Sequence, residues 1–292
     1  MENNFLKSEF AQKSRFHWDF ISNYKDLEKW EILSDNFNYF HNKKEKKINI
    51  LQIPKIIHQI WIGPRRFPKK YADWAETWKL LNPSWEYKLW TEKELNSLNF
   101  VNQSQFENSK SIGFKSDLAR YEILNLYGGL YLDTDFECIN PIPNHLLNYD
   151  FVSCVVFSNS PQIANGMIMS QKGSKLIRSL IDNIKKPSDN LKPFKIIESS
   201  GAIKLTSIYY DLNSDEKKKC LILPSNYFYP YPNFLLGKSI NIYDLCKPYT
   251  IGLHHWEMSW MKGSYMQRAI RKLVKILIRF LKIFKLNNHL KY

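Results

Sequence analysis

The sequence has few cysteines and no long apolar run, and each absence excludes a class of protein. Its four cysteines, at positions 138, 154, 220 and 246, lie far apart, so they form no CxxC pair for a zinc knuckle or a redox motif. We expect them to be reduced thiols. The first ten residues, MENNFLKSEF, lack the pattern of a signal peptide, and no uninterrupted apolar stretch is long enough to span a bilayer. The sequence therefore predicts a cytoplasmic protein that meets membranes only peripherally.

The sequence also has fewer acidic than basic residues. There are 28 Asp and Glu against 42 Lys and Arg, which gives a formal net charge of +14. This excess suits an anionic partner such as a nucleotide-sugar, a phospholipid surface or a nucleic acid, and charge alone does not choose among them. With 292 residues, 44% of them hydrophobic, the chain can bury one large core and carry an appendage.

The hydrophobic pattern divides the chain into three parts. Residues 1–50 mix aromatic and charged side chains and predict a helical N-terminal extension that ends in a lysine-rich linker. From residue 51 to 263, strand-like and helix-like patterns alternate, which predicts an α/β domain with a sheet layered by helices. Strands are expected at 53–62, 86–90, 130–132, 151–157, 166–170, 221–223 and 249–253.

Helix signals lie between these strands. A helix is expected at 71–81, and Thr91 with Glu94 has the spacing of a capping box that opens the next one. Ser116 or Asp117 is expected to cap a helix that runs to Tyr127. Apolar residues occur on nearly every face of this helix, so we expect it to be buried.

An acidic triplet, Asp133-Thr134-Asp135, follows the short strand predicted at 130–132. In extended backbone, Asp133 and Asp135 would project to the same face. Two such carboxylates repel each other unless a cation lies between them, and oxygen ligands favour Mg²⁺ or Mn²⁺. An ion held there could bridge a diphosphate and stabilise its charge as it leaves. Short triplets of this kind also occur by chance in surface turns.

The surroundings of the triplet favour function over chance. Gly128-Gly129 ends the preceding helix, and ligands of open α/β sheets bind at strand ends. On that helix Asp117 and Arg120 are three residues apart and share a face. The guanidinium could bind phosphate through two hydrogen bonds, while the carboxylate could accept hydrogen bonds from sugar or ribose hydroxyls. The alternative is a plain ion pair within the helix.

Several blocks of sequence resemble the DXD-containing sugar-binding family of glycosyltransferases. They are Ile57-His58-Gln59-Ile60-Trp61, Asn82-Pro83 with Trp85, Ser116-Asp117-Leu118-Ala119-Arg120-Tyr121, Tyr127-Gly128-Gly129-Leu130-Tyr131-Leu132-Asp133-Thr134-Asp135, and His254-His255-Trp256 with Ser259-Trp260. The family includes yeast mannosyltransferases, bacterial capsular and lipopolysaccharide transferases and, more distantly, clostridial glucosylating toxins. The resemblance spans roughly residues 53–260. It implies a GT-A-like nucleotide-sugar-binding fold with a central mixed sheet flanked by helices, dependence on Mn²⁺ (or Mg²⁺), and retention of anomeric configuration.

The resemblance also assigns site residues by position. The donor-binding residues would be Trp61, which would stack on the donor base, Asp117, Arg120, Tyr131, Asp133, Asn165, Ser259 and Trp260. The catalytic residues would be Asp117, Arg120, Asp133 and Asp135. Asp133 and Asp135 would bind the metal, and His254 or His255 could complete its ligands, with a slight preference for His255. Ser259 and Trp260 would close over the diphosphate.

The C-terminal segment, residues 264–292, has the pattern of a basic amphipathic helix. One helical face would carry Arg268, Arg271, Lys272, Lys275, Arg279 and Lys282, and the opposite face Leu273, Leu277, Phe280, Leu281 and Phe284. This pattern favours an interfacial helix on an anionic membrane surface. A helix packed on the core with a solvated charged face is the alternative. We expect no nucleic acid partner, because no recognised nucleic-acid-binding module accompanies the charge.

These features together predict a retaining, metal-dependent hexosyltransferase. It would move a sugar from a nucleotide-diphosphate sugar to a glycan or lipid-linked acceptor, in polysaccharide or glycolipid biosynthesis. One alternative is a sugar-phosphate nucleotidyltransferase, but residues 53–63 lack the glycine- and lysine-rich phosphate loop of such enzymes. Another is a non-catalytic basic protein that binds membranes or nucleic acid on a transferase scaffold, which the intact Asp133, Asp135 and Arg120 disfavour.

Overall fold

The computed structural model describes residues 24–42, 52–157, 160–184, 193–232 and 239–257. The chain divides into two compact units, residues 1–256 and 257–292, and every described helix and strand belongs to the first. Three sequence-based predictions lie outside the described residues. They are the lysine-rich linker that follows residue 42, the pair Ser259 and Trp260, and the C-terminal helix of residues 264–292.

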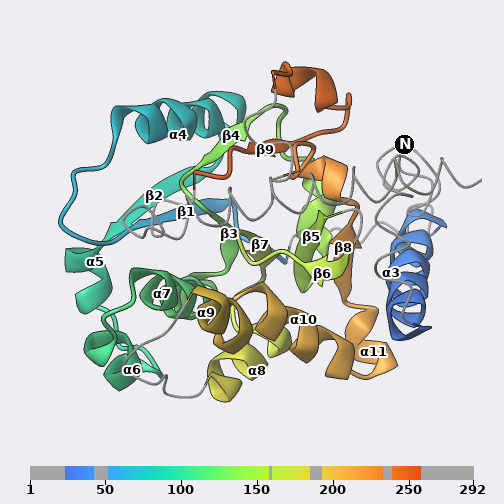
Figure 1. Cartoon of the computed structure of the whole chain (residues 1–292), viewed down its shortest axis with the longest axis horizontal. Coiled ribbons are helices and arrows are strands. Elements are labelled where there is room, and N and C mark those ends of the chain that lie inside the picture. The colour runs from blue at the N-terminus through green and yellow to red at the C-terminus, as the bar shows by residue number, and fades with distance from the viewer. Residues whose placement is uncertain (1–23, 43–51, 158–159, 185–192, 233–238, 258–292) are drawn as a thin grey trace, which may run out of the picture. The chain divides into compact units, whose positions relative to one another are not determined.

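A mixed sheet of seven strands forms the centre of the first unit (Figure 1). Its strands are β1 (Ile56–Trp61), β2 (Glu86–Thr91), β3 (Gly129–Leu132), β5 (Phe151–Phe157), β6 (Ser160–Ile163), β7 (Met167–Ser170) and β8 (Cys220–Leu223). They lie in the order β2-β1-β3-β7-β5-β6, and β8 also pairs with β5. Strand β7 is antiparallel to both β3 and β5, whereas β1 is parallel to β3 and β8 is parallel to β5. The carboxyl ends of β1, β3, β5 and β8 therefore point toward the same edge of the sheet.

A two-stranded ribbon lies beside this sheet. Strand β4 (Phe136–Cys138) pairs antiparallel with β9 (Gly252–His254), and Phe136 is the partner of His254 in the register. The main chain of His255 continues the contact, because its N–H donates to the carbonyl of Asp135 at 2.9 Å. The ribbon thus joins the acidic triplet to a segment near the end of the described chain.

Helices flank the sheet and confirm the α/β class predicted from the sequence. They are α3 (Tyr24–Asn42), α4 (Lys69–Leu81), α5 (Glu92–Asn96), α6 (Gln103–Asn108), α7 (Ile112–Tyr127), α8 (Lys175–Asn183), α9 (Pro193–Ser199), α10 (Ala202–Asp211) and α11 (Ser214–Lys217), with short 3-10 turns η2 (Asn144–Asn148), η3 (Ser225–Tyr227) and η5 (Ile242–Leu245). Figure 1 shows α4 along the β4–β9 ribbon at the top, and α7, α8, α9 and α10 on the opposite side of the sheet. Among the described helices, none has the length and apolar content needed to cross a bilayer.

Helix α7 is buried, as its sequence predicts. Phe114, Tyr121 and Leu124 are each fully enclosed. The predicted start of this helix is wrong: it begins at Ile112, because the Ser111 side chain accepts a hydrogen bond from the Phe114 N–H at 3.3 Å and caps it there. Its end at Gly128 is confirmed, and the positive φ of 68° at this residue explains the glycine.

Several other boundaries differ by a few residues from those predicted. The first strand begins at Ile56 and not at Ile53, because the Ile53 N–H bonds to the carbonyl of Leu147 and Pro54 has no N–H to offer the sheet. The last strand begins at Gly252 and not at Tyr249, because the Thr250 N–H is used in a turn with the Lys247 carbonyl. The capping box of Thr91 and Glu94 is confirmed, with a backbone contact of 3.0 Å.

Helix α3 covers the outer edge of β8. The Asn36 side chain acts there as a short strand would: its Nδ2 donates to the carbonyl of Cys220 at 2.7 Å, and its Oδ1 accepts from the Ile222 N–H at 3.1 Å. An uncovered strand edge exposes such groups to pairing with other chains. A helix was expected within the first fifty residues, and α3 is that helix; the boundary at residue 50 stays a prediction.

Candidate metal and donor site

The acidic triplet lies in a turn and not in extended backbone. Strand β3 ends at Leu132, and the Phe136 N–H donates to the carbonyl of Asp133 at 3.2 Å, which closes the turn. The two aspartates do lie close together, but the predicted cause, alternation along a strand, is wrong, because they belong to a turn. The turn is fixed from two other elements: the Asp133 N–H donates to the Gly166 carbonyl at 2.8 Å, and Gln59 Nε2 donates to the Asp133 carbonyl at 3.1 Å.

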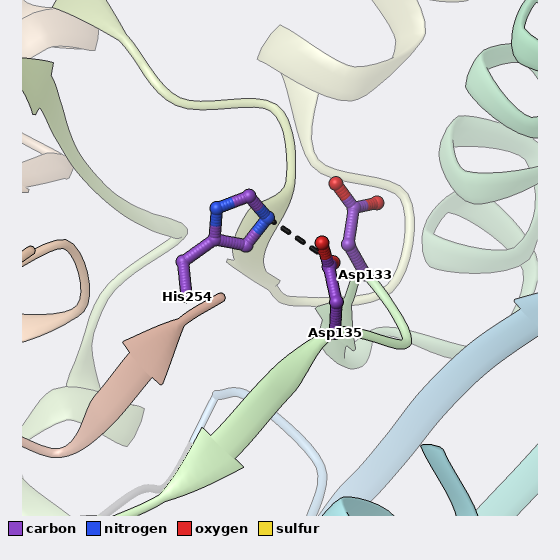
Figure 2. A group of neighbouring side chains, drawn as sticks. All are labelled: Asp133, Asp135 and His254. Carbon is purple, nitrogen blue, oxygen red and sulfur yellow. Dashed lines mark ion pairs between the residues drawn. The ribbon is translucent and has the colours of Figure 1, made fainter. Parts of the chain in front are cut away.

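The turn and the ribbon bring three candidate metal ligands together (Figure 2). Asp133, Asp135 and His254 each offer one ligand atom, and these atoms lie within 4.8 Å of one another. His254 Nε2 is 3.1 Å from Asp135 Oδ1, and both side chains are largely enclosed, whereas the Asp133 side chain is 32% exposed. Burial raises the pKa of Asp133, and the nearby Arg120 partly offsets this. A cation would relieve the cost of ionising two carboxylates at this position.

His255 lies elsewhere. Its Nε2 is 2.9 Å from Glu137 Oε2, and its ring stacks on Trp74 with 4.1 Å between the ring centres. Consecutive residues of a strand point to opposite faces, so only one of the two histidines can face the aspartates. The contact of Nε2 with Asp135 Oδ1 makes that residue His254. The geometry thus favours His254 over His255 as a metal ligand, the reverse of the sequence-based preference.

The two oxygens of Asp133 have different surroundings. Oδ1 accepts a hydrogen bond from the Tyr131 hydroxyl at 2.8 Å and lies 3.3 Å from Arg120 Nη1. Oδ2 faces the Cα of Gly166, where an added Cβ would come within 2.5 Å of it. Among the described residues Oδ2 has no hydrogen-bond partner, so it is the oxygen available to a cation, and only a glycine fits beside it. Tyr131 also packs its ring against the Arg120 guanidinium, at 4.5 Å.

Arg120 is enclosed by acceptors. Its guanidinium nitrogens lie 2.6 to 3.3 Å from five oxygens, which are the Ser116 carbonyl, Ser116 Oγ, the Asn165 carbonyl, Asp117 Oδ1 and Asp133 Oδ1. A guanidinium has five N–H groups, so each has an oxygen in reach. This arrangement does not fit the expected bidentate phosphate contact, because the groups that would make it already face the protein.

Asp117 and Asn165 belong to the same network. Asp117 Oδ1 accepts from Asn165 Nδ2 at 2.9 Å and pairs with Arg120 Nη2 at 3.1 Å, while its Oδ2 accepts from Ser200 Oγ at 2.7 Å. Burial raises the pKa of Asp117 to about 6, and Arg120 opposes that rise. The structure thus brings together Asp117, Arg120 and Asn165, and it adds Ser200, which the sequence did not indicate.

Trp61 lies at the carboxyl end of β1, on the same edge of the sheet as Asp133. Its indole N–H donates to the carbonyl of Arg65 at 2.7 Å, and its ring meets those of Phe67 and Tyr71 edge-on at 5.5 Å. The side chain is only partly buried. Its described contacts are with the loop after β1 and with α4, and not with the aspartates.

Sequence reasoning missed three residues of this site. Gln59 is fully buried on β1, where it holds the Asp133 carbonyl and accepts from the Tyr87 hydroxyl at 2.6 Å. Gly166 lies against Asp133, and Tyr229 packs against His254 with 5.1 Å between ring centres. A polar residue in the middle of the apolar strand 56–61 was a usable signal for Gln59. Nothing local in the sequence marks Tyr229.

The sequence of this chain is similar to those of known glycosyltransferases. Residues 68–152 match the family model described as a glycosyltransferase sugar-binding region containing the DXD motif. The chain is 30% identical over 164 residues to inositol phosphoceramide mannosyltransferase 3 of Schizosaccharomyces pombe, which covers 54% of this chain and 45% of that protein. It is 31% identical over 110 residues to the initiation-specific alpha-1,6-mannosyltransferase of Candida albicans, covering 34% of this chain and 28% of that protein. The match thus spans less than half of each of these relatives.

Solved structures give a weaker similarity. The catalytic domain of alpha-toxin from Clostridium novyi aligns over 89% of this chain and 90% of its own, with a TM-score of 0.49 and 10% identity. The PaToxG glycosyltransferase aligns over 63% of this chain and 80% of its own, with a TM-score of 0.42 and 16% identity.

Proposed function

We propose that this protein transfers a sugar from a nucleotide-diphosphate sugar to a glycan or lipid-linked acceptor, because residues 68–152 match the model of the glycosyltransferase sugar-binding region that contains the DXD motif. One observation carries the proposal. Two carboxylates and an imidazole, from the triplet and from β9, converge within 4.8 Å at the edge where the parallel strands end. Ligand sites of α/β sheets lie at such edges.

The donor set of Asp133 Oδ2, Asp135 and His254 fits a divalent cation. Two oxygen ligands and one nitrogen suit Mn²⁺, and Mg²⁺ is the alternative because carboxylates bind both ions. When bound, the ion would supply positive charge that stabilises the diphosphate as it leaves the sugar. The carboxylates and the imidazole orient that charge, since each is fixed by the turn or by the ribbon.

We assign Arg120, Tyr131 and Asp117 a role in organising the donor pocket. Arg120 and Tyr131 hold Oδ1 of Asp133, which leaves Oδ2 facing Gly166. Asp117 in turn holds Arg120 and Asn165. These residues line the wall beside the proposed metal, while Trp61 offers an aromatic surface to the donor base at the same sheet edge.

For the donor, we propose a nucleotide-diphosphate hexose, with mannose as the first candidate because the relatives from S. pombe and C. albicans are named as mannosyltransferases. We further propose that the product retains the anomeric configuration of the donor, and that the acceptor belongs to polysaccharide or glycolipid biosynthesis.

The test is an assay of a panel of nucleotide-diphosphate sugars with the purified chain and Mn²⁺. We expect one donor to be hydrolysed slowly without acceptor, and NMR to show the retained anomer in the released or transferred sugar. Asp133→Asn should abolish this activity, and chelation of all divalent ions should do the same. Consumption of a nucleoside triphosphate and a sugar phosphate, with none of the panel hydrolysed, would instead indicate a nucleotidyltransferase.

A further inference from the structure

Tyr229 follows the 3-10 turn η3 and is packed into the wall of the metal and donor site. The residue is 4% exposed. Its ring lies 5.1 to 5.4 Å from three other rings, those of His254, Phe136 and Trp256. The ring is therefore held by the same ribbon that carries the proposed imidazole ligand.

The Tyr229 hydroxyl and the free oxygen of Asp133 face the same point. A Cβ added to Gly166 would lie 2.9 Å from the Tyr229 hydroxyl oxygen and 2.5 Å from Asp133 Oδ2. Both oxygens therefore lie close to Gly166, beside the proposed metal. A ligand group that reaches Asp133 Oδ2 would come near the phenol as well.

This hydroxyl also differs from the other buried tyrosine hydroxyls of the site. Tyr131 donates to Asp133, and Tyr121 donates to the carbonyl of Ser200. Among the described residues, the hydroxyl of Tyr229 has no hydrogen-bond partner, and it is not one of the fully enclosed polar atoms, as the Tyr209 hydroxyl is. Tyrosine hydroxyls in buried positions normally bond to a partner. A group from outside the described chain is the natural partner here.

We propose that Tyr229 is a further donor-binding residue, whose hydroxyl donates a hydrogen bond to a phosphate oxygen of the nucleotide-diphosphate sugar beside the proposed metal. This inference rests on the proposed function. A cation held by Asp133 Oδ2 would draw a phosphate oxygen to this side of the carboxylate. A neutral phenol can bond to that oxygen without adding charge to the site, and hydrogen bonds to ionised acceptors are the stronger kind.

The test compares two variants that each remove one hydroxyl. Tyr229→Phe keeps the ring and its packing and loses only the donor group. Tyr209→Phe, on α10, removes a hydroxyl that is enclosed without a partner among the described residues. We expect Tyr229→Phe to lower kcat/KM for the nucleotide sugar by about tenfold to a hundredfold. Its affinity for Mn²⁺ alone should match that of the wild type, and Tyr209→Phe should leave kcat/KM close to the wild-type value.

Equal kcat/KM values for the two variants would overturn the proposal, because the Tyr229 ring would then serve packing alone. If Tyr229→Phe proves less stable, the same comparison at a temperature where both variants are fully folded decides the matter. Calorimetry with GDP or UDP and Mn²⁺ separates this inference from the proposed function. If the wild type binds the diphosphate but consumes no nucleotide sugar, the function is wrong, and weaker binding by Tyr229→Phe still supports the role of the hydroxyl.

Discussion

His254 Nε2 lies 3.1 Å from Oδ1 of Asp135, across the antiparallel ribbon of β4 and β9. The contact depends on register, because Phe136 pairs with His254 and the next histidine turns to the other face. A shift of one residue in the register would turn the His254 side chain to the opposite face of the ribbon, away from Asp135. The candidate metal site is thus a property of two strands and not of the acidic triplet alone.

The two histidines give the first prediction. We expect His254→Gln to weaken Mn²⁺ binding by at least about tenfold, because it removes a proposed ligand. His255→Gln removes the contact with Glu137 on the other face and should leave Mn²⁺ affinity within a few-fold of the wild type. Calorimetric titration of each variant with Mn²⁺ measures the two affinities. Equal losses would indicate that both residues act through the stability of the ribbon.

The second prediction concerns the aspartates. Asp133→Asn and Asp135→Asn should each lower turnover by about a hundredfold or more, since each removes a charged ligand of the proposed ion. Neither should lower the melting temperature, because the change relieves repulsion between two partly buried carboxylates. Asp215→Asn, at a side chain that is 89% exposed, is the control. Wild-type turnover after complete removal of divalent ions would contradict the metal-dependent mechanism.

The third prediction tests the network around Arg120. A lysine at this position keeps the charge but has three N–H groups, fewer than the five oxygens that surround the guanidinium. We expect Arg120→Lys to lower the free energy of unfolding by about 1 to 3 kcal/mol, because buried acceptors lose their partners. Turnover should fall as well, since Asp133 Oδ1 loses a contact. Chemical denaturation and donor hydrolysis measure the two effects; normal values for both would reduce Arg120 to a dispensable ion-pair partner.

Gly166 gives the fourth prediction. Its φ is not in the left-handed region, so the effect of Gly166→Ala is steric and not conformational. The new methyl group would come within 2.5 Å of Asp133 Oδ2, and one of the two must move. We expect a loss of Mn²⁺ affinity and of kcat of about tenfold or more with a modest change in stability. An alanine variant with wild-type Mn²⁺ affinity would show that Oδ2 is not the ligand atom.

The fifth prediction is a pH dependence of stability at His58. This histidine is enclosed on β1, with Nδ1 accepting from Trp90 Nε1 at 3.1 Å and Nε2 bonded to the Gly128 carbonyl at 2.8 Å. Burial lowers its pKa from 6.5 to about 4. His58 of the unfolded chain is therefore protonated as the pH falls below about 6.5, whereas His58 of the folded chain stays neutral down to about pH 4. The stabilisation is present above pH 6.5 and is lost as the pH falls through this window.

The expected loss over that window is about 3 kcal/mol. Urea unfolding of the wild type and of His58→Gln at steps between pH 7 and pH 4 provides the measurement. Glutamine does not titrate, so the unfolding free energy of the variant should depend less on pH. The difference in slope should correspond to about one fewer proton taken up on unfolding. Identical pH slopes for the two proteins would show that His58 can accept a proton inside the fold.

Local signals in the sequence were enough for most elements of the fold. The buried helix α7, its end at Gly128 and the capping box at Thr91 each follow from residues within a few positions of one another. The start of α7 was misplaced because Ser111 and Ser116 are both plausible caps. In the structure Ser111 is the cap, and Ser116 lies inside the helix, where its carbonyl and hydroxyl face Arg120 of the same helix.

The candidate site was predictable only in part, because some of its residues meet through contacts between distant segments of the chain. Asp133, Asp135, Asp117 and Arg120 lie in motifs that can be read along the chain. The choice of His254 over His255 depends on strand register, and Tyr229 reaches the site from a loop distant in sequence. Even the convergence of the aspartates comes from a turn fixed by Gln59 and Gly166, and not from strand alternation.

The β4–β9 ribbon has a consequence for the order in which the protein becomes active during its synthesis. Glu137 and His255, which meet across the ribbon, are separated by 118 residues of chain. A nascent chain that has left the ribosome only as far as β8 already contains the acidic triplet, but it has neither the strand that pairs with β4 nor the imidazole beside Asp135. Under the proposed function, tight binding of the ion, and with it turnover of the donor, would therefore wait until β9 is released and docked. The complete set of proposed metal ligands would thus form only in a chain that includes β9.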